Sequence, residues 1–366
     1  MKKKILFITS DRSDFNLQKD LIIKLQNIYN CYLFCTGTHF DKKFGLTINN
    51  IKNSKIKNLI FSKIKNVNNI DFFKLNSIYL DKFNKIINKI KPDLLILFGD
   101  RSEILICSFV AYSKKINIAH FYGGEVTKGS LDNKYRDGIS IFSNYHFTSN
   151  INHKKNVINL GFRRENVFSY GSLLNDVFSK KNFYNKQKVE KKYNVKLSKY
   201  NYVLTFHTDK ENNIKDYKKV FESIKGLDKT SIFICRPNND PGSKEILKLI
   251  NKTKNNKKNI FFIKDYGTKY YFSLVKLSNG VIGNSSSGIS EIPGLNKPSI
   301  NIGDRQKGRP RSRSVIDVGY DIKKIKKAIL KTRSKEFLKM IKKNNNPYFK
   351  KNALLNTKKE IIKILK

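Results

Sequence analysis

Short apolar runs alternate along the chain with longer segments whose apolar residues recur three and four positions apart. This alternation predicts parallel strands joined by crossover helices. In the first half, strands are predicted at 4–9, 32–37, 94–99, 117–122, 145–149 and 167–171. The second half repeats the theme at 202–207, 231–236, 260–265, 280–284 and 298–303. Helices are predicted between the strands, for example at 80–90, and a last helix over 352–365.

The repetition of this pattern predicts an α/β protein with two doubly wound, Rossmann-like domains. Residues 176–200 are polar, rich in lysine and without strong apolar periodicity, which is typical of a connection between domains. We therefore expect an N-terminal domain over 1–175, a C-terminal domain over 176–350 and a C-terminal helix over 351–366. Ligands bind beyond the carboxyl ends of parallel strands, so polar residues that follow strands are the functional candidates, facing a cleft between the domains.

Composition narrows the class of protein. The 366 residues are 39% hydrophobic, enough for ordinary cores, and the longest apolar runs are too short to span a bilayer. The opening "MKKKILFITS" has a short apolar run that leads into "DRSD", which favours a first core strand over a signal peptide. Four scattered cysteines without zinc spacing favour buried free thiols and a cytoplasmic protein.

The net charge of +45 invites a nucleic-acid interpretation. Lysine and asparagine are nevertheless spread over almost every predicted helix and loop, which favours solvated faces over a binding stripe. Only "GDRQKGRPRSRS", residues 303–314, concentrates arginine, and its alternatives are a solvated basic loop or phosphate contacts. We expect neither a nucleic-acid nor a membrane partner.

The stretch "GVIGNSSSGISEIPG", residues 280–294, is the first candidate for anion binding. A strand ends at Gly283, and serines precede a predicted helix, whose free amides and positive dipole end favour phosphate. Glu291 lies on another face of that helix, where its carboxylate is suited to ribose hydroxyls. The alternative is a serine-capped helix with a solvent-facing glutamate.

Other candidates also follow predicted strands. They are Arg12, Asp100, Arg101, His207 and Asn238. A histidine in such a place is more often structural, but several donors and cations at strand ends point toward one site. The stretch "AHFYGGEVTKGSLDNKY", residues 119–135, adds two acids, Glu125 and Asp132, in a glycine-containing turn. The alternative for either acid is the cap of a helix that begins near Asn133.

Two long stretches resemble the UDP-N-acetylglucosamine 2-epimerase family. They are "GDRSEILICSFVAYSKKINIAHFYGGEVTKGSLDNKYRDGIS" and "IGNSSSGISEIPGLNKPSINIGDRQKGR". Weaker matches at "DRSDF", "TGTH" and "RPNNDPGSKE" fall in the same order, so the resemblance covers about 4–330. The hydrolysing branch, which supplies N-acetylmannosamine for sialic-acid synthesis, is the most similar.

The resemblance implies a GT-B-like fold and a reaction that needs no metal and no redox cofactor. It places Ser285, Ser286, Glu291 and Arg305 at the nucleotide, together with Arg12 and Asn238; Arg101, a cation at a strand end, is expected there as well. His207 then lies at the phosphates and counts among the catalytic residues. The catalytic acids that it implies are Asp100 and Asp132, with Glu125 on the same loop. A UDP-sugar is the expected partner, and a homo-oligomer, either dimer or tetramer, is the expected assembly.

One departure concerns Tyr122. Some hydrolysing members carry a glutamate at this position, three residues before the glutamate of "GGE". Other branches vary here, including ones thought to act on a UDP-linked diacetamido-trideoxyhexose on the way to legionaminic acid. The expected reaction removes the hydrogen of carbon 2 as UDP leaves carbon 1, and water then adds to the glycal. Besides the hydrolysing epimerase of UDP-N-acetylglucosamine, the alternatives are this second sugar, a non-hydrolysing epimerase and a GT-B glycosyltransferase.

Overall fold

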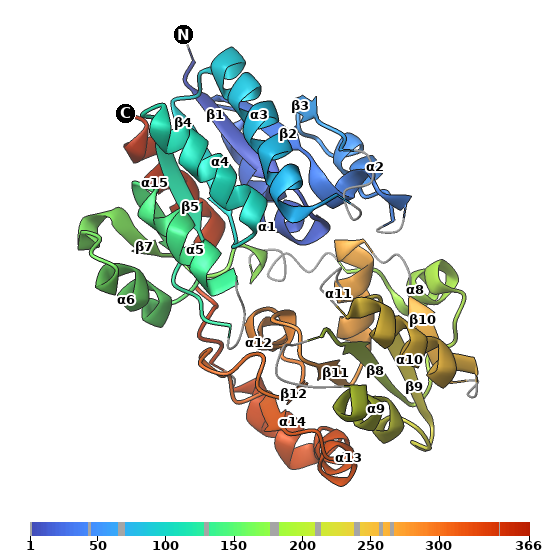
Figure 1. Ribbon diagram of the computed structural model, residues 1–366. Helices are drawn as coiled ribbons and strands as arrows, with labels where there is room; N and C mark the ends of the chain where they lie inside the picture. Colours follow the sequence, from blue (N-terminus) through green and yellow to red (C-terminus); the bar gives the residue numbers. More distant parts are fainter. Residues whose placement is uncertain are drawn as a thin grey trace. The chain divides into compact units, whose positions relative to one another are not determined.

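The chain forms two α/β units in a computed structural model (Figure 1). The structure describes residues 2–42, 45–64, 70–127, 132–175, 183–208, 214–237, 242–255, 259–263, 267–343 and 345–366. By their contacts, Met1–Glu125, Leu131–Asp176 and Lys350–Lys366 form unit 1. Val126–Ser130 and Val177–Phe349 form unit 2. By this division, residues 126–130, which lie between the candidate acids Glu125 and Asp132, belong to unit 2, whereas the residues on both sides of them belong to unit 1.

Unit 1 contains a parallel sheet in the order β3-β2-β1-β4-β5-β6-β7. Its strands are β1 (Lys4–Thr9), β2 (Asn30–Cys35), β3 (Asn58–Phe61), β4 (Leu94–Phe98), β5 (Asn117–Phe121), β6 (Tyr145–Thr148) and β7 (Val167–Ser169). Its helices are α1 (Arg12–Leu25), α2 (Ile48–Lys52), α3 (Phe72–Ile90), α4 (Ser102–Ser113), α5 (Asp132–Ile141), α6 (Ile151–Asn159) and α15 (Ala353–Ile364). The order reverses between β1 and β4, and that reversal defines the ligand crevice of a doubly wound sheet.

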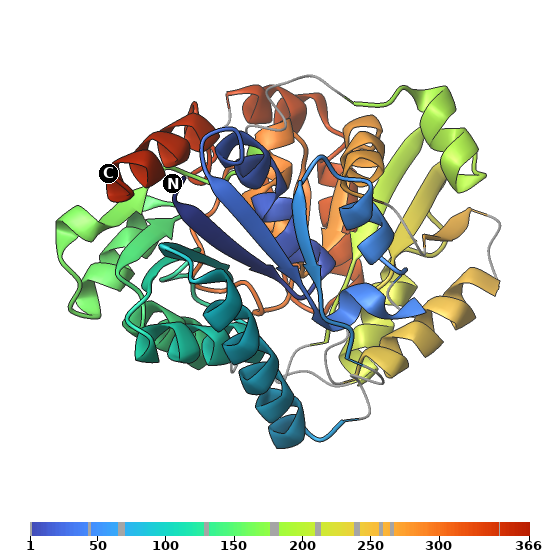
Figure 2. The same cartoon turned by 90° about the horizontal axis from the view of Figure 1, so that it is seen from above.

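Alternating side chains of the unit 1 strands build a core on each face of the sheet. Ile5 and Phe7 of β1 point to the face that α1 and α15 cover, whereas Leu6 and Ile8 point to the face that α3, α4 and α5 cover (Figure 1). Figure 2 shows the red C-terminal helix α15 beside the blue N-terminal elements of the same unit. The end of the chain thus completes the core of the first unit.

Unit 2 repeats the design with a parallel sheet in the order β10-β9-β8-β11-β12-β13. Its strands are β8 (Tyr200–Thr205), β9 (Thr230–Cys235), β10 (Ile260–Ile263), β11 (Gly280–Gly283), β12 (Ser299–Ile302) and β13 (Val315–Val318). Its helices are α8 (Lys186–Tyr193), α9 (Ile214–Ser223), α10 (Ser243–Asn255), α11 (Thr268–Leu277), α12 (Ser287–Ser290), α13 (Ile322–Lys331) and α14 (Lys335–Lys342). Here the order reverses between β8 and β11.

The predicted fold class is confirmed, and two strands were missed. All the strands predicted from apolar runs are present with shifts at their ends, but β3 and β13 had not been expected. Both are four-residue edge strands whose side chains are only partly buried or exposed, and their uninterrupted apolar runs, "LIF" and "VI", are shorter than those of the central strands. In the described part of the chain, no helix is long and apolar enough to cross a membrane.

Candidate active site

Several of the predicted site residues lie where the strand order of a sheet reverses. In unit 1, Arg12 opens the helix after β1, and Asp100 and Arg101 follow β4, the strand that pairs with β1. In unit 2, His207 follows β8 and Ser285 follows β11, and these strands also pair. The topology therefore gives each unit one crevice at its sheet's carboxyl edge, with predicted residues on both of its sides.

A buried arginine organises the acids of unit 1. The Arg136 side chain, only 2% exposed, forms an ion pair with Asp100, whose side chain is 30% exposed. The same guanidinium donates to the Glu125 carbonyl oxygen at 2.6 Å and to Asn133 Oδ1 at 3.0 Å. A planar guanidinium offers its donors in a fixed fork. Arg136 therefore fixes the residue after β4, Asp100, relative to the loop that carries Glu125. Asp132 is the first residue of α5, one helical turn before Arg136.

His120 supports the turn that carries Asp100. Its Nε2 donates to the Gly99 carbonyl oxygen at 2.8 Å, so its Nδ1 accepts from the Ser140 hydroxyl at 2.9 Å. Burial lowers the pKa of His120 to about 4, so the ring is neutral at physiological pH. A neutral buried imidazole with both nitrogens bonded is a positioning element for the neighbouring turn.

The Glu125 side chain points to α6. Ser149 donates its hydroxyl to Glu125 Oε1 at 2.8 Å, and His153 Nδ1 lies 3.8 Å from the same oxygen. This side chain is 12% exposed. These contacts join the Glu125 carboxylate to the turn before α6 and to α6 itself.

Tyr122 packs into the core of unit 1. Its hydroxyl accepts a hydrogen bond from the Leu173 amide at 3.2 Å, and its ring lies 5.9 Å from that of Phe98. Its backbone is left-handed, with φ of 68°, which is rare for a bulky residue and sharpens the turn after β5. Tyr122 is thus part of the hydrophobic core of unit 1.

The turn between β1 and α1 is a hydrogen-bonded carboxylate cluster. Asp11 caps α1, and Asp14 accepts from the Ser10 and Asp11 amides at 3.0 and 3.2 Å. Burial, with the nearby Asp11 charge, raises the pKa of Asp14 to about 7. Burial also pushes the pKa of Asp11 upward, but the Arg101 guanidinium and bonds from Ser13 outweigh it and lower this pKa to about 2. The cluster fixes the start of the helix that carries Arg12.

Arg101 faces this cluster from the other side of the crevice. Its Nε donates to Glu103 Oε1 at 2.6 Å, and this carboxylate raises the pKa of Arg101 above its ordinary value. Because Asp11 also raises it, Arg101 is a permanent cation at the β1–β4 crevice. Such a cation is suited to an anionic ligand.

Asn284 is the structural hub of the unit 2 crevice. Its side chain exchanges two hydrogen bonds of 2.8 Å with the backbone of His207 and so joins the ends of β8 and β11. Its carbonyl oxygen accepts from Arg305 Nη1 at 3.2 Å and from Gln306 Nε2 at 2.9 Å. These bonds bring His207 and Arg305 together, within one unit, with the turn that carries Ser285 and Ser286, here called the serine turn.

The serine turn begins directly after Asn284. Ser285 and Ser286 are half-buried, and no hydrogen bond within the described part of the chain uses their backbone amides. The helix that follows, α12, is only four residues long, with Glu291 as its C-cap, so the turn itself, rather than a long helix dipole, supplies the donors. Hydroxyls and amides aimed from a turn are suited to phosphate oxygens.

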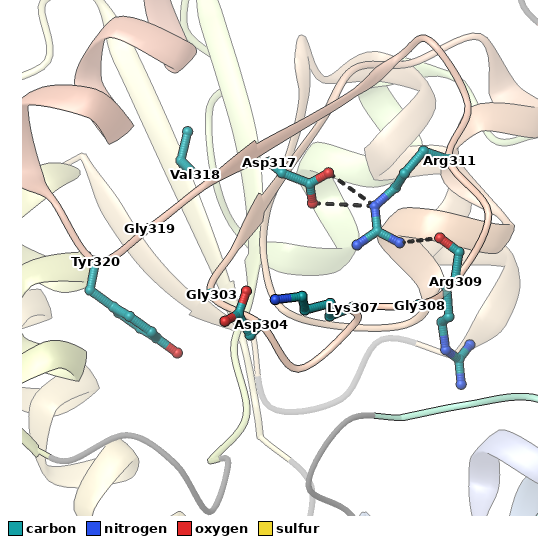
Figure 3. A pocket seen from close by; sticks show the side chains of 10 residues that line it. All are labelled: Gly303, Asp304, Lys307, Gly308, Arg309, Arg311, Asp317, Val318, Gly319 and Tyr320. Atoms are coloured by element: carbon teal, nitrogen blue, oxygen red, sulfur yellow. Dashed lines mark hydrogen bonds and ion pairs between the residues drawn. The ribbon is translucent and has the colours of Figure 1, made fainter.

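A pocket of about 630 Å³ lies beside this site in unit 2, at the carboxyl ends of β12 and β13 (Figure 3). Lys307 and Tyr320 line it, and Arg311 donates to both carboxylate oxygens of Asp317 there. Arg309 is buried and binds the Val126 carbonyl oxygen and the Thr127 hydroxyl, both at 3.2 Å. For Arg309, this contradicts the solvated-loop interpretation.

The structure thus gathers the predicted residues into two sets, one in each unit. Asn238 lies outside the described residues. Sequence reasoning missed Arg136, Ser149, His153 and Asn284. Of these, Arg136 had a usable signal, because it follows Asp132 by four positions in a predicted helix and so shares its face. In the described ranges, no group of three or more His, Cys, Asp or Glu side chains is placed to hold a metal ion.

Comparison with known proteins identifies the family. The family described as UDP-N-acetylglucosamine 2-epimerase matches residues 23–366. The chain belongs to the UDP-N-acetylglucosamine 2-epimerase family. It is 35% identical to the GDP/UDP-N,N'-diacetylbacillosamine 2-epimerase (hydrolyzing) of Campylobacter jejuni, over 92% of this chain and 89% of the relative. It is 33% identical to the polysialic acid biosynthesis protein P7 of Escherichia coli, over 97% and 92%.

Solved structures of this epimerase family share the fold. The crystal structure of UDP-GlcNAc 2-epimerase from Neisseria meningitidis bound to UDP-GlcNAc superposes with a TM-score of 0.82 at 18% identity, covering 98% of this chain and 100% of that one. The Staphylococcus aureus MnaA–UDP structure gives 0.80 at 16% identity, over 100% and 97%. The protein is therefore a nucleotide-sugar 2-epimerase family member with two Rossmann-like units, as in GT-B-like proteins.

Proposed function

We propose that this protein is a hydrolysing 2-epimerase that converts a UDP-linked 2-acetamido sugar into UDP and the free sugar inverted at carbon 2. The observation that carries the proposal is the Asp100 carboxylate, fixed by buried Arg136 at the strand-order reversal of a chain in this family. That arrangement supplies a partly exposed carboxylate of defined orientation, as proton abstraction requires.

In the proposed first step, Asp100 takes the proton from carbon 2. The electron pair of that C–H bond forms the double bond to carbon 1, and the bond from carbon 1 to the diphosphate oxygen breaks, giving UDP and a glycal. In the second step, water adds its hydroxyl to carbon 1, and a proton enters carbon 2 from the opposite face. Glu125 and Asp132 are proposed to handle these protons in the hydration step.

Unit 2 is proposed to bind the nucleotide. Ser285, Ser286 and Arg305 are placed around the Asn284 hub to meet the diphosphate, and His207 is held at the same hub. Glu291 is proposed to accept bonds from the ribose hydroxyls. Arg12 and Arg101, with Asn238, are proposed as further nucleotide contacts. Cations and fixed donors at the leaving diphosphate would stabilise the charge that develops as the bond to carbon 1 breaks.

Two sugars are candidates for the substrate. The similarity to the Campylobacter jejuni relative, which is named for diacetylbacillosamine, favours UDP-N,N'-diacetylbacillosamine. Tyr122 supports the same choice, because its packed side chain leaves no carboxylate at a position where some UDP-N-acetylglucosamine enzymes have one. UDP-N-acetylglucosamine remains the second candidate, in agreement with the described family.

Incubation of the protein with each UDP-sugar and no acceptor tests the proposal. We expect UDP and a free sugar of manno configuration at carbon 2 from one of the two, and no release by Asp100→Asn. A UDP-linked epimer as the sole product would indicate a non-hydrolysing epimerase. Release that requires an added acceptor would indicate a glycosyltransferase. Either result would contradict the proposal.

A further inference from the structure

The loop that carries Glu125 is packed tightly on α6. Gly124 has φ of 73°, and a β-carbon on it would lie 2.3 Å from the His153 carbonyl oxygen and 2.9 Å from Val157 Cγ2. Asn156 Nδ2 donates to the Gly124 carbonyl oxygen at 2.8 Å. The backbone just before Glu125 therefore has one position relative to α6, and this close approach requires glycine.

The side chains of α6 and its preceding turn continue this contact to the carboxylate. Ser149 Oγ lies 2.8 Å from Glu125 Oε1 and 2.8 Å from His153 Nδ1. An ionised carboxylate only accepts hydrogen bonds, so the single Ser149 proton goes to Glu125. His153 Nδ1 must then carry a proton and donate it to Ser149. The order of donors is His153, Ser149, Glu125.

Asn150 contacts the same imidazole. Asn150 Nδ2 lies 3.3 Å from His153 Nε2 and 3.1 Å from Nδ1, and Asn150 Oδ1 accepts from the His153 backbone amide as the cap of α6. This amide nitrogen lies slightly nearer to Nδ1 than to Nε2, so the assignment of the tautomer follows from the Ser149 bond alone. The His153 side chain is 2% exposed, so this arrangement is screened from water.

We propose that Ser149 and His153 are positioning residues for Glu125, which hold its carboxylate and connect it to a buried imidazole through one hydroxyl. This inference rests on the proposed function, because Glu125 acts in the proposed hydration step. It assigns a task to two residues that follow β6 and begin α6.

Kinetics of serine variants test the proposal. We expect Ser149→Ala to lower kcat by roughly 10–100-fold, with KM and the UDP dissociation constant within about 2-fold, since the nucleotide is proposed to bind unit 2. Ser149→Thr keeps the hydroxyl and should restore most of kcat. Ser143→Ala is the matched control, because Ser143 is also buried but donates to the Ile139 carbonyl oxygen and touches no carboxylate. The control should stay within about 2-fold of wild type.

His153 variants separate positioning from general stability. His153→Gln should change the pH dependence of kcat. In the control Ser143→Ala, the pH dependence of kcat should stay that of the wild type. Unchanged kcat in Ser149→Ala, or equal losses in Ser149→Ala and Ser149→Thr, would overturn the proposal. Loss of UDP affinity in parallel with kcat would do the same, because it would indicate a general structural defect.

A spectroscopic measurement keeps this inference distinct from the proposed reaction. Nitrogen-15 NMR of labelled histidine should show His153 as the Nδ1-protonated tautomer, and Glu125→Gln and Ser149→Ala should each shift its Nδ1 resonance. Ser143→Ala should not. If no UDP-sugar reacts but these shifts appear, the proposed function fails and the hydrogen-bonded chain stands. If the sugar reacts and His153 is protonated only at Nε2, the proposed order of hydrogen bonds from His153 through Ser149 to Glu125 is wrong.

Discussion

At the scale of single residues, the buried guanidinium of Arg136 is the centre of the proposed acid site. It joins Asp100 at the end of β4 to the backbone of Glu125 and to Asn133 in α5. Loss of one partner from a buried ion pair leaves a charge without compensation, so the role of Arg136 is structural as well as electrostatic. Asp100, by contrast, is the more exposed partner, which suits the proposed contact with substrate.

This contrast gives a prediction for Asp100→Asn. We expect turnover to fall by about 10²–10⁴-fold, because the amide cannot accept the carbon 2 proton. The dissociation constant for UDP should change by less than about 3-fold, because Asp100 is not among the proposed nucleotide contacts. Steady-state kinetics with calorimetric titration of UDP measure both. Near-normal turnover would show that another acid is the base.

Asp14 gives a prediction about pH and stability. Its pKa rises from 3.8 to about 7 in the folded protein because of burial and Asp11. Between these values the folded state binds more protons than the unfolded one, so this group's stabilising contribution is complete below about pH 4 and is lost as pH rises through about 7. Asp14→Asn removes that dependence, whereas the opposing contribution of the neighbouring His39, whose pKa burial lowers to about 4, is retained.

Urea unfolding of both proteins across this pH range checks the sign. The free energy of unfolding of wild type, minus that of Asp14→Asn, should decrease by roughly 2–4 kcal/mol between about pH 4.5 and 7.5. The difference should level off above the folded pKa. Parallel curves for the two proteins would show that Asp14 has an ordinary pKa in the folded state.

At the scale of elements, the two strand-order reversals explain why the candidate residues gather where they do. Close packing at the end of β11 is part of that design. Gly283 has φ of 140°, and a β-carbon there would lie 1.9 Å from the Thr205 carbonyl oxygen of β8. The glycine lets the ends of β8 and β11 approach, so that Asn284 can bond to His207.

Two glycine variants of unit 2 test this requirement. Gly283→Ala should lower the free energy of unfolding by about 4 kcal/mol or more, since it combines backbone strain with a backbone clash. Gly226→Ala is the control: its φ of 70° is also left-handed, but no atom lies within 4 Å of the added β-carbon. It should cost about 1 kcal/mol. An equal loss of unfolding free energy in the two variants would mean that β8 and β11 are not closely packed at Gly283.

Sequence pattern predicted the elements well where strands are central and poorly at the edges. Central strands such as β4, "LLILF", are buried on both faces and form long continuous apolar runs, whereas the edge strands β3 and β13 contain runs of only three and two apolar residues. Candidate acids and serines could be predicted because they follow strands. Ser149 and His153 could not, because their contact with Glu125 depends on the pairing of β5 with β6, which aligns Phe121 with Phe147. A single sequence does not show which residues of two neighbouring strands are paired.

At the scale of the whole molecule, the net charge of +45 is spread widely rather than collected in one stripe. Such a charge attracts an anionic substrate over a distance, and salt screens this attraction. We expect kcat/KM for the UDP-sugar to fall several-fold between about 50 and 500 mM NaCl, with kcat changing less than about 2-fold. Steady-state assays over this range test it, and a salt-independent kcat/KM would contradict it.

The central claim is that carbon 2 loses its hydrogen to the protein as UDP leaves and regains one from solvent. Proton NMR of the products formed in heavy water tests this most directly, with UDP-N,N'-diacetylbacillosamine and UDP-N-acetylglucosamine supplied separately and without an acceptor. We predict free sugar with inverted configuration and deuterium at carbon 2, in amounts equal to the UDP released. Free sugar that keeps its original hydrogen and configuration at carbon 2 would contradict the account.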